Sequence, residues 1–144
     1  TDDNFINNFD KSIHVFLAVG QIKDSKKRSD LYQKYYNSGF ELPFIISNTA
    51  IVSNYSQISS GSIIMNNVII GGYSKIGENC IINNNSLIEH NCVIGNNSHI
   101  STGVIINGNC VIGKNSFIGS NSTVNNNVKI EDFSIVPSHS RIAK

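Results

Sequence analysis

The sequence predicts a mainly β fold, a solenoid of short parallel strands that follows a partial α/β segment. The first observation is a period of six, in which sixteen positions from Val52 to Ile142 carry only isoleucine or valine. The second is a small side chain two positions before each of them, and the third is an asparagine or glycine three positions after most of them. Neither a helix nor a hairpin produces this spacing.

Each six-residue unit is interpreted as one wall of a coil. Residues two apart in a strand share a face, so the branched and the small side chains point inward and the residue between them points outward. Burial of one Ile or Val is worth roughly 1.5 to 3 kcal/mol, so this core is expected to provide most of the stability. The branched positions are Val52, Ile58, Ile64, Ile70, Ile76, Ile82, Ile88, Ile94, Ile100, Ile106, Ile112, Ile118, Val124, Ile130, Val136 and Ile142.

The asparagines and glycines are predicted to form the corners of the coil. Both residue types tolerate a positive φ at a tight turn. The regular isoleucines exclude a disordered polar tract, although asparagine is abundant. The predicted corner residues are Gly61, Asn67, Asn79, Asn85, Asn91, Asn97, Gly103, Asn109, Asn115, Asn121 and Asn127.

The first fifty residues follow different rules. A buried strand is predicted over Ile13–Val19, a helix over Ser25–Asn37 closed by Gly39, and a second strand over Pro43–Ile46. This is half of an α/β unit. A complete nucleotide-binding domain needs an earlier strand, a glycine-rich turn and another helix.

The predicted organisation is a partial α/β substrate-binding segment over residues 1–47 and the β-solenoid over residues 48–144. Because the sequence starts without Met, we expect a fragment whose missing front carried part of a substrate site. The chain has 144 residues, a net charge of +1, no Trp and no apolar run long enough to cross a bilayer. Composition therefore predicts one soluble unit with a small appendage and no membrane partner.

The basic cluster near the helix start is short and interleaved with acidic residues. A solvated helix start is therefore favoured over a phosphate-binding patch, and nucleic acid is not expected as a partner. The cluster comprises Lys23, Lys26, Lys27 and Arg28.

The three cysteines all fall in the inward small-residue register. Cys92 and Cys110 are expected to stack one coil apart, and such buried thiols predict a reducing cytoplasm. A zinc site built from His90, Cys92 and His99 is disfavoured because Cys92 faces the core and the spacing matches no familiar ligand pattern. No metal is expected.

The repeats resemble those of hexapeptide-repeat left-handed β-helix proteins, and this resemblance implies three hexapeptides, or 18 residues, per coil. On that pitch the sequence places Gly72, His90, Gly108 and Asn126 in one vertical stack. An imidazole beside bare backbone forms a cleft in which a ligand can lie against the histidine. The alternative is that the glycines fit tight corners and His90 is an ordinary surface residue.

The outward residues predict two exposed apolar stripes on adjacent walls. A monomer seldom leaves such stripes uncovered, so they favour a closed cyclic oligomer, most simply a homotrimer with His90 at the rim of the interface. For His99, which lies in the second stripe, a packed structural role and a ligand contact both stay open. The stripes are Ile51, Ile69, Leu87 and Ile105, and Ile63, Ile81, His99, Phe117 and Ile135.

The stretch SLIEHNCVIGNNSHISTG at residues 86–103, with glycines after Asn107, Ile112 and Ile118, resembles the PglD/NeuD family of bacterial sugar acetyltransferases. The resemblance implies transfer of acetyl from acetyl-CoA to a sugar amine or hydroxyl. It implies His90 as general base, a suitable role for a neutral imidazole. It also implies that the amide of Gly108 binds the thioester oxygen.

The same resemblance implies roles for further residues. His99, Ser120 and Ser138 match positions that contact the coenzyme, and Asn83 matches an active-site asparagine supplied by a neighbouring subunit. The stretch FLAVG at residues 16–20 resembles the strand and glycine that end the family's nucleotide-sugar-binding domain, which assigns Gly20 to substrate binding.

Two departures from the family pattern concern the base and the tail. The residue after the histidine is Asn91 where relatives often carry a carboxylate that raises the basicity of the histidine. Either Glu89 supplies the charge, or the base works without a carboxylate and transfer is slower, or the substrate needs less help. The sequence also ends just past Ile142 without the Pro-containing tail of relatives, so weaker binding of acetyl-CoA is expected.

The implied acceptor is a nucleotide-linked 4-amino sugar or a sialic acid, used in surface glycan biosynthesis. One alternative is a noncatalytic β-solenoid scaffold or binding protein, although the ordered ladders of outward threonine seen in ice-binding solenoids are missing. Another is a carbonic-anhydrase-like β-helix, which needs three histidines on one zinc ion. When the sequence is arranged in coils of 18 residues, His14 and His139 lie far from His90, so this alternative fits poorly.

Overall fold

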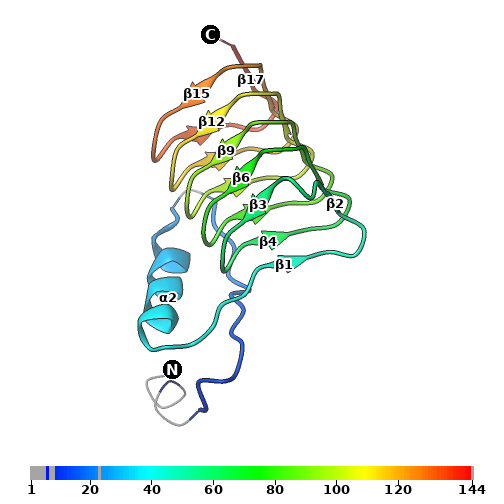
Figure 1. Ribbon diagram of the computed structural model, residues 1–144. Coiled ribbons are helices and arrows are strands. Elements are labelled where there is room, and N and C mark those ends of the chain that lie inside the picture. The colour runs from blue at the N-terminus through cyan, green and yellow to red at the C-terminus, as the bar shows by residue number, and fades with distance from the viewer. Residues whose placement is uncertain (1–5, 7–8, 23, 144) are drawn as a thin grey trace.

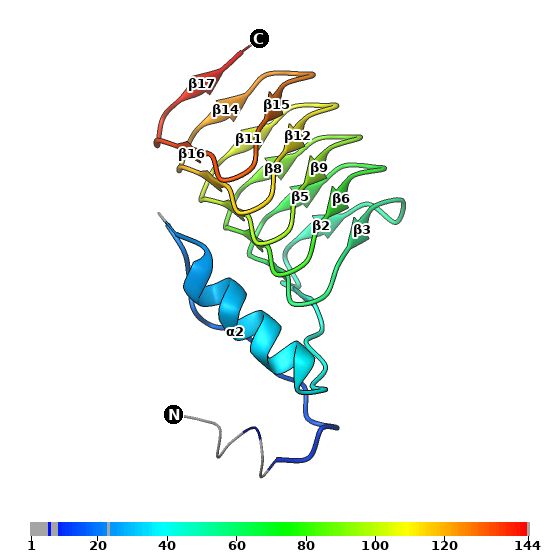
Figure 2. The ribbon, with the colours of Figure 1, turned by 90° about the vertical axis from the view of Figure 1, so that its left-hand side faces the viewer.

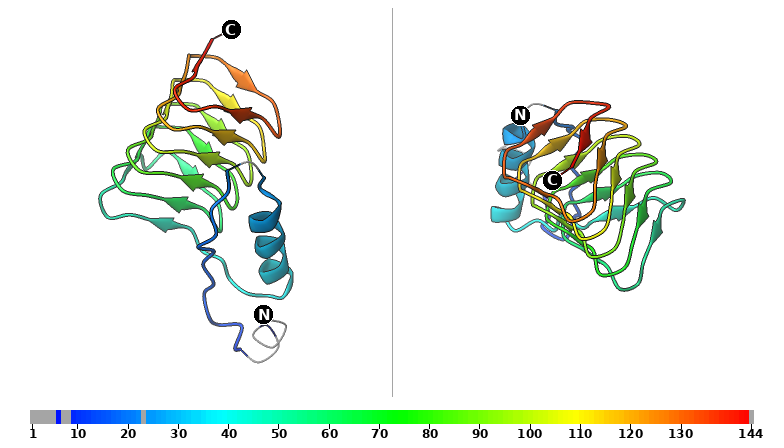
Figure 3. Two further views of the ribbon diagram at one scale, coloured as in Figure 1. Left: turned by 180° about the vertical axis from the view of Figure 1, so that it is seen from behind. Right: turned by 90° about the horizontal axis from the view of Figure 1, so that it is seen from above.

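The structure is a computed structural model that describes residues 6, 9–22 and 24–143. Its main body is a parallel β-solenoid with a triangular cross-section, and one helix lies against its outer side (Figures 1 and 3). Each wall of the triangle is a parallel sheet whose neighbouring strands are 18 residues apart in the chain. The predicted fold class, with three hexapeptides in each coil, is confirmed.

The three sheets have six, six and five strands of two residues each. The first sheet contains β1 (Ile45–Ile46), β4 (Ile63–Ile64), β7 (Ile81–Ile82), β10 (His99–Ile100), β13 (Phe117–Ile118) and β16 (Ile135–Val136). The second sheet contains β2 (Ile51–Val52), β5 (Ile69–Ile70), β8 (Leu87–Ile88), β11 (Ile105–Ile106), β14 (Thr123–Val124) and β17 (Arg141–Ile142). The third sheet contains β3 (Gln57–Ile58), β6 (Lys75–Ile76), β9 (Val93–Ile94), β12 (Val111–Ile112) and β15 (Lys129–Ile130).

The core of the coil consists of the predicted branched residues. Those from Ile64 to Ile130 are buried, while Val52, Ile58, Val136 and Ile142 are half-buried because they lie in the end coils. The predicted corners are also confirmed. The nine asparagines named above have φ between 55° and 60°, and Gly61 and Gly103 have φ of 69° and 68°.

The small inward residues have a second role that depends on their polar atoms. The hydroxyl of Ser62 donates to the carbonyl of Gly77 at 2.7 Å, and Ser98 donates to Gly113 at 2.8 Å. Each of these carbonyls belongs to a corner of the next coil, fifteen residues on. Because buried carbonyls need a donor, a serine or cysteine at the inward register satisfies the corner peptides.

The helix α2 (Lys26–Asn37) agrees with the predicted helix, with Ser25 at its N-cap and Gly39 at φ 84° after its end. It belongs to the N-terminal arm, by which we mean residues 13–44. The helix runs along the corner between the third and first sheets, where Ser25 contacts Asn115 and Tyr32 contacts Ser60 (Figures 1 and 2). The helix therefore runs from the later coils toward the earlier ones, opposite to the direction in which the solenoid grows along the chain.

The predicted strand over Ile13–Val19 is wrong. This segment is extended but forms only one isolated bridge, between His14 and Glu41. The carbonyls of Leu17 and Val19, which a strand partner would use, accept hydrogen bonds from the guanidinium of Arg28 instead. The second predicted strand is present as β1, but it pairs with β4 of the coil, so the partial Rossmann-like unit is not confirmed.

The interpretation of the basic cluster as a solvated helix start is wrong for Arg28. Its side chain is 1% exposed, and besides Leu17 and Val19 it donates to the carbonyls of Gly61 at 3.2 Å and Asn79 at 3.4 Å. One guanidinium therefore joins the arm to two successive corners of the coil. No helix within the described residues has the length and apolarity needed to span a bilayer.

The arm also changes the predicted apolar stripes. Ile81 and His99, which were expected to be exposed on the first sheet, are each only 7% exposed because the arm covers them. The prediction of an exposed stripe on this wall is therefore wrong at its centre. The second sheet keeps its exposed apolar face, with Ile51, Ile69 and Ile105 all exposed.

Candidate active site

His90 lies at the corner that follows β8, between the second and third sheets. The register of β8 on β11 pairs Ile88 with Ile106 and so places His90 beside Gly108, as the 18-residue stack predicted. A Cβ atom on Gly108 would lie 2.7 Å from both Cε1 and Nε2 of the imidazole. The ring therefore lies on the bare backbone of Gly108, and no other residue fits there without displacing it.

The alternative that the glycines merely fit tight corners does not explain this site. The left-handed residues of these corners are Tyr73 and Asn109, with φ of 61° and 60°, and not Gly72 and Gly108. A Cβ on Gly72 would meet only Ser53 Oγ, at 3.5 Å. Gly108 is thus required by the imidazole, whereas the space beside Gly72 stays open.

Asn91 contacts the other ring nitrogen of His90. Its amide nitrogen lies 2.9 Å from Nδ1, and its backbone N–H donates to the carbonyl of Gly72 at 3.0 Å. With the amide nitrogen facing the ring, Nδ1 accepts and Nε2 carries the proton. With the amide turned over, its oxygen accepts from Nδ1–H and leaves Nε2 free. Asparagine can therefore hold either tautomer, whereas a carboxylate selects the second.

Gly108 is buried, and its backbone amide is the second group of interest at this corner. Among the described residues, no acceptor takes its N–H, while the next amide, of Asn109, donates to the carbonyl of His90 at 3.0 Å. An unpaired backbone N–H beside an imidazole can bind a developing oxyanion while the imidazole accepts a proton. The corner thus contains both groups that acyl transfer needs.

His99 lies on the first sheet and is held by the N-terminal arm. Its Nδ1–H donates to the carbonyl of Gln21 at 2.5 Å, and the side-chain amide of Asn83 lies 3.4 Å from Nε2. The ring packs edge-on against Phe117, with centroids 5.3 Å apart. Burial lowers the pKa of His99, and the charge of Arg28 adds to this effect while the Gln21 carbonyl opposes it. His99 is therefore neutral near pH 7.

Three of the predicted site residues line one pocket of about 350 Å³ between the arm and the first sheet. Asn83 and His99 form its coil side, and Gly20 lies on its arm side. Leu17, Ile63 and Ile81 give it a largely apolar lining. Sequence reasoning assigned these residues to different ligands and did not place them together.

Ser120 and Ser138 lie at the corner between the first and second sheets, one coil apart. Ser120 Oγ lies 2.8 Å from Ser101 Oγ, and Ser138 is exposed. A Cβ on Gly119 would lie 2.4 Å from the backbone nitrogen of Ser138, so the two coils approach closely here. This corner is at the opposite edge of the second sheet from His90. Within one chain, Gly108 is therefore the predicted coenzyme residue that lies beside the predicted base, whereas Ser120 and Ser138 lie away from it.

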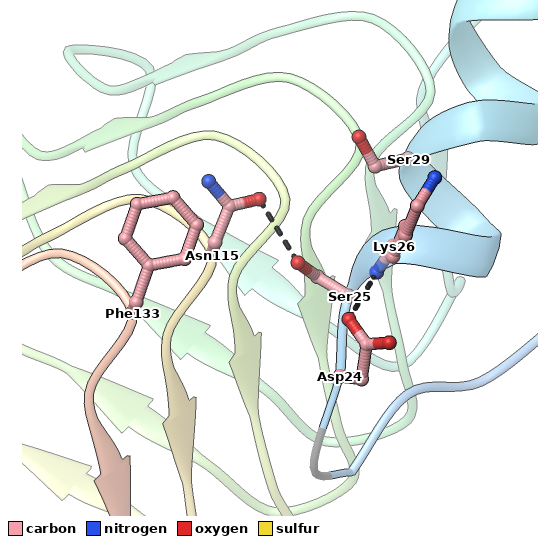
Figure 4. A pocket seen from close by; sticks show the side chains of 6 residues that line it. All are labelled: Asp24, Ser25, Lys26, Ser29, Asn115 and Phe133. Atoms are coloured by element: carbon pink, nitrogen blue, oxygen red, sulfur yellow. Dashed lines mark hydrogen bonds between the residues drawn. The ribbon is translucent and has the colours of Figure 1, made fainter.

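A second pocket, of about 430 Å³, lies between the start of α2 and the corner at Asn115 (Figure 4). Ser25 Oγ donates to Asn115 Oδ1 at 2.9 Å across it, and Asp24 accepts from the backbone N–H of Lys26 at 2.8 Å. None of the predicted site residues lines this pocket. Its contacts attach the helix to the coil.

The described residues contain no cluster of three or more His, Cys, Asp or Glu side chains arranged to hold a metal ion. Cys92 is fully buried inside the coil, His90 lies at a corner and His99 lies on another wall. These three side chains therefore lie in different places, inside the coil, at a corner and on the first sheet.

Sequence reasoning missed the contributions of Gln21 and Arg28. The spacing of residues in the sequence does not indicate the contacts that these two residues make. Gln21 acts through its backbone carbonyl, and Arg28 binds carbonyls up to 51 residues away. One signal was present in the sequence, since Arg28 precedes Tyr32 by one helical turn and shares its face. Both side chains are buried.

Comparison with protein families gives one match. The family described as bacterial transferase hexapeptide (six repeats) matches residues 73–108 and 109–144, which together make up half of the chain. Comparison with curated protein sequences gives no match.

Solved structures share the fold over most of the chain. PerB from Caulobacter crescentus and a mutant of perosamine N-acetyltransferase from the same organism, both in complex with CoA and GDP-perosamine, are each 27% identical, with TM-scores of 0.87 over 91% of this chain. This chain covers 61% and 62% of theirs, about three fifths of their length. The acetyltransferase domain of PglB from Neisseria gonorrhoeae FA1090 has a TM-score of 0.92 at 23% identity, over 98% of this chain and 68% of its own, and supports the fold alone.

Proposed function

Since the chain belongs to the bacterial transferase hexapeptide family, we propose that it transfers the acetyl group of acetyl-CoA to an amino or hydroxyl group of a sugar. The likeness to Caulobacter structures that contain CoA and GDP-perosamine supports both the coenzyme and the class of acceptor. The observation that carries the proposal is the imidazole of His90 lying on Gly108, next to an unpaired amide.

In the proposed reaction, Nε2 of His90 removes a proton from the acceptor amine or hydroxyl as that group attacks the thioester carbon. The thioester oxygen gains negative charge and accepts a hydrogen bond from the N–H of Gly108. The C–S bond then breaks, the new C–N or C–O bond remains, and the proton on His90 passes to the departing thiolate. Acetyl-CoA acts as a cosubstrate, and no metal takes part.

Asn91 is proposed to hold His90 in the reactive tautomer. Its amide oxygen would accept from Nδ1–H, which leaves Nε2 unprotonated. An amide carries no charge, so it orients the ring without raising its basicity as a carboxylate would. Of the possibilities raised by the sequence, an uncharged partner for the base is the one we adopt, because Asn91 and not Glu89 contacts the ring.

We propose a homotrimer in which neighbouring copies complete each site. Its support is the separation of the predicted residues onto opposite edges of the second sheet, whose outer face is apolar and exposed at Ile51, Ile69 and Ile105. A neighbouring copy would then bring the second edge to the His90 corner. The residues assigned to that edge are Asn83 for the active site and Ser120 and Ser138 for the coenzyme. His99, also assigned to the coenzyme, lies on the adjoining first sheet.

For the acceptor we propose a nucleotide-linked amino sugar used in surface glycan biosynthesis, because GDP-perosamine is bound in the related Caulobacter structures. Gly20 is proposed to contact this substrate, since it lies at the pocket formed with His99. This agrees with a division into a substrate-binding segment at residues 1–47 and an acetyltransferase domain at residues 48–144. The three free, buried cysteines support a cytoplasmic location.

The test is release of CoA thiol from acetyl-CoA in the presence of GDP-perosamine, other nucleotide-linked amino sugars or sialic acid. We expect His90→Ala to reduce turnover at least about 100-fold, since a general base contributes about 10² to 10⁴. The matched control is His139→Asn, at an exposed corner of the last coil with φ 59°, which should leave turnover unchanged.

Two outcomes would contradict the proposal. Unchanged turnover in His90→Ala would remove His90 from the role of base. A folded wild-type protein that releases no thiol with any acceptor would favour the alternative, a noncatalytic β-solenoid scaffold or binding protein.

A further inference from the structure

The corner that carries His90 is held from inside the coil by a column of small polar residues. Ser74 Oγ donates to the carbonyl of Glu89 at 2.6 Å, Cys92 Sγ lies 3.2 Å from the carbonyl of Asn107, and Cys110 Sγ lies 3.0 Å from the carbonyl of Asn125. Each of these carbonyls is the first of its corner. The same contact thus recurs on three successive coils.

The peptide held by Cys92 is the one that carries the proposed oxyanion donor. The carbonyl of Asn107 and the N–H of Gly108 belong to one peptide group, which is trans. In a trans peptide the C=O and N–H bonds point in opposite directions. Because the carbonyl points inward to Cys92, the N–H of Gly108 points outward, on the side where the imidazole of His90 lies.

We propose that Cys92 is a positioning residue for acetyl transfer: its thiol fixes the Asn107–Gly108 peptide so that the N–H of Gly108 faces the thioester oxygen. This inference rests on the proposed function. An oxyanion donor is effective only within about 2.7 to 3.1 Å of the developing charge, so a small rotation of this peptide weakens it. Among the described residues, the hydrogen bond to Cys92 is the one that holds the carbonyl of Asn107.

Two further observations fit this role. Cys92 is fully buried, so it touches neither acceptor nor coenzyme and acts through the peptide alone. Burial raises the pKa of the Cys92 thiol, which therefore stays protonated at neutral pH and can donate. Sγ also lies 3.6 Å from the carbonyl of His90, so the thiol lies beside the backbone of both reacting positions.

The test compares two equally buried cysteines in the same column. Cys92→Ala removes the donor under the Asn107–Gly108 peptide. Cys110→Ala removes the donor under the Asn125–Asn126 peptide of the next coil, which has no proposed role, and a longer contact of 3.9 Å to the carbonyl of Gly108. Turnover is measured with acetyl-CoA and GDP-perosamine, or with whichever acceptor in the screen supports thiol release. We expect Cys92→Ala to lower kcat about 10- to 100-fold with an unchanged KM for acetyl-CoA, less than the loss of about 10² to 10³ for removing an oxyanion donor outright.

A rescue variant separates positioning from packing. Cys92→Ser should keep kcat within about threefold of wild type, because a serine in this column makes the same bond at Ser74. Cys110→Ala should lower the thermal midpoint as much as Cys92→Ala while kcat stays within about threefold of wild type. Equal kcat values for the two alanine variants would overturn the proposal.

A second measurement does not depend on activity. The amide signal of Gly108 in a proton–nitrogen NMR spectrum should shift more in Cys92→Ala than in Cys110→Ala, because the Cys110 thiol contacts Gly108 only at its carbonyl, at 3.9 Å. An unmoved Gly108 signal in Cys92→Ala would overturn the inference even if transfer is observed. If the signal moves but the wild-type protein transfers no acetyl group, the peptide is positioned as inferred and it is the proposed function that fails.

Discussion

The coil and the N-terminal arm are stabilised in different ways. In the coil, every turn repeats the same contacts: an inward isoleucine or valine, a serine or cysteine that satisfies a corner carbonyl, and an asparagine or glycine at most corners. In the arm, a small cluster around Leu17, Tyr32 and Leu42 surrounds one buried cation, Arg28. Stability is therefore spread over many equivalent positions in the coil and concentrated in few positions in the arm.

This difference determines what a single substitution can do. Removing one contact from the coil leaves the contacts of the other turns in place. Removing Arg28 leaves four carbonyl acceptors without their donor at once, two in the arm and two in the coil. The arm should therefore detach as a unit, and because it covers His99, its detachment should also change the pocket at Gly20.

The largest effect is expected from Arg28→Ala. We expect the arm to lose about 2 to 4 kcal/mol of stability, because buried carbonyls lose their hydrogen bonds and a charged donor is removed. Hydrogen exchange measured by mass spectrometry should then show fast exchange in residues 13–22 and 26–37 and unchanged protection in the coil.

Lys27→Ala is the matched control for Arg28→Ala, since Lys27 is the next residue toward the N-terminus on the same helix and is exposed. It should leave the exchange of the arm at the wild-type rate. Loss of protection throughout the coil in Arg28→Ala would contradict the view that the two regions are stabilised separately.

The second effect is a pH dependence at the junction of the two regions. The folded state lowers the pKa of His99 below its ordinary value of 6.5, mainly through burial. Below pH 6.5 the unfolded chain therefore binds more protons than the folded chain at this residue. The contribution of neutral His99 to the free energy of unfolding is therefore fully present above pH 6.5. It decreases as the pH falls from 6.5 through the lower pKa of the folded state.

Hydrogen exchange of the arm, measured at about pH 7.5 and about pH 5 and corrected for the intrinsic rates, checks this expectation. Protection of residues 13–22 should decrease at the lower pH in the wild type. In His99→Gln, whose amide can still donate to the carbonyl of Gln21, the two values should agree more closely. Equal pH dependence in both proteins would assign the effect to other groups.

The same contrast explains which parts of the fold the sequence could predict. Sixteen branched residues and eleven corner residues each repeat one local requirement, so their spacing determines the coil before any contact is known. The extended segment Ile13–Val19 has strand-like composition, but composition cannot show that Arg28 takes the carbonyls of Leu17 and Val19. A segment becomes a β-strand only when its backbone pairs with a neighbouring strand, and here the backbone carbonyls pair with the side chain of Arg28 instead.

The candidate site divides in the same way. His90 and Gly108 were predicted to be neighbours because the coil converts an 18-residue spacing into contact. The pocket that joins Gly20 to His99 was not predicted, because it depends on how an irregular segment crosses the first sheet. The burial of Ile81 was missed for the same reason.

The smallest effect tests the repeat itself. Tyr73 occupies a corner at φ 61°, where the same position of the next three coils is Asn91, Asn109 and Asn127. A tyrosine in this region costs about 1 to 2 kcal/mol, and its exposed ring recovers about 0.5 to 1.5 kcal/mol by stacking on Tyr55 at 5.4 Å. Tyr73→Asn should therefore raise the free energy of unfolding by up to about 1 kcal/mol, measured by denaturant titration. Tyr55→Ala removes the stacking alone and should lower it. If both variants are destabilised equally, Tyr73 is not strained at this corner. The tolerance of asparagine for positive φ would then not explain why asparagine occupies the corners of the coil.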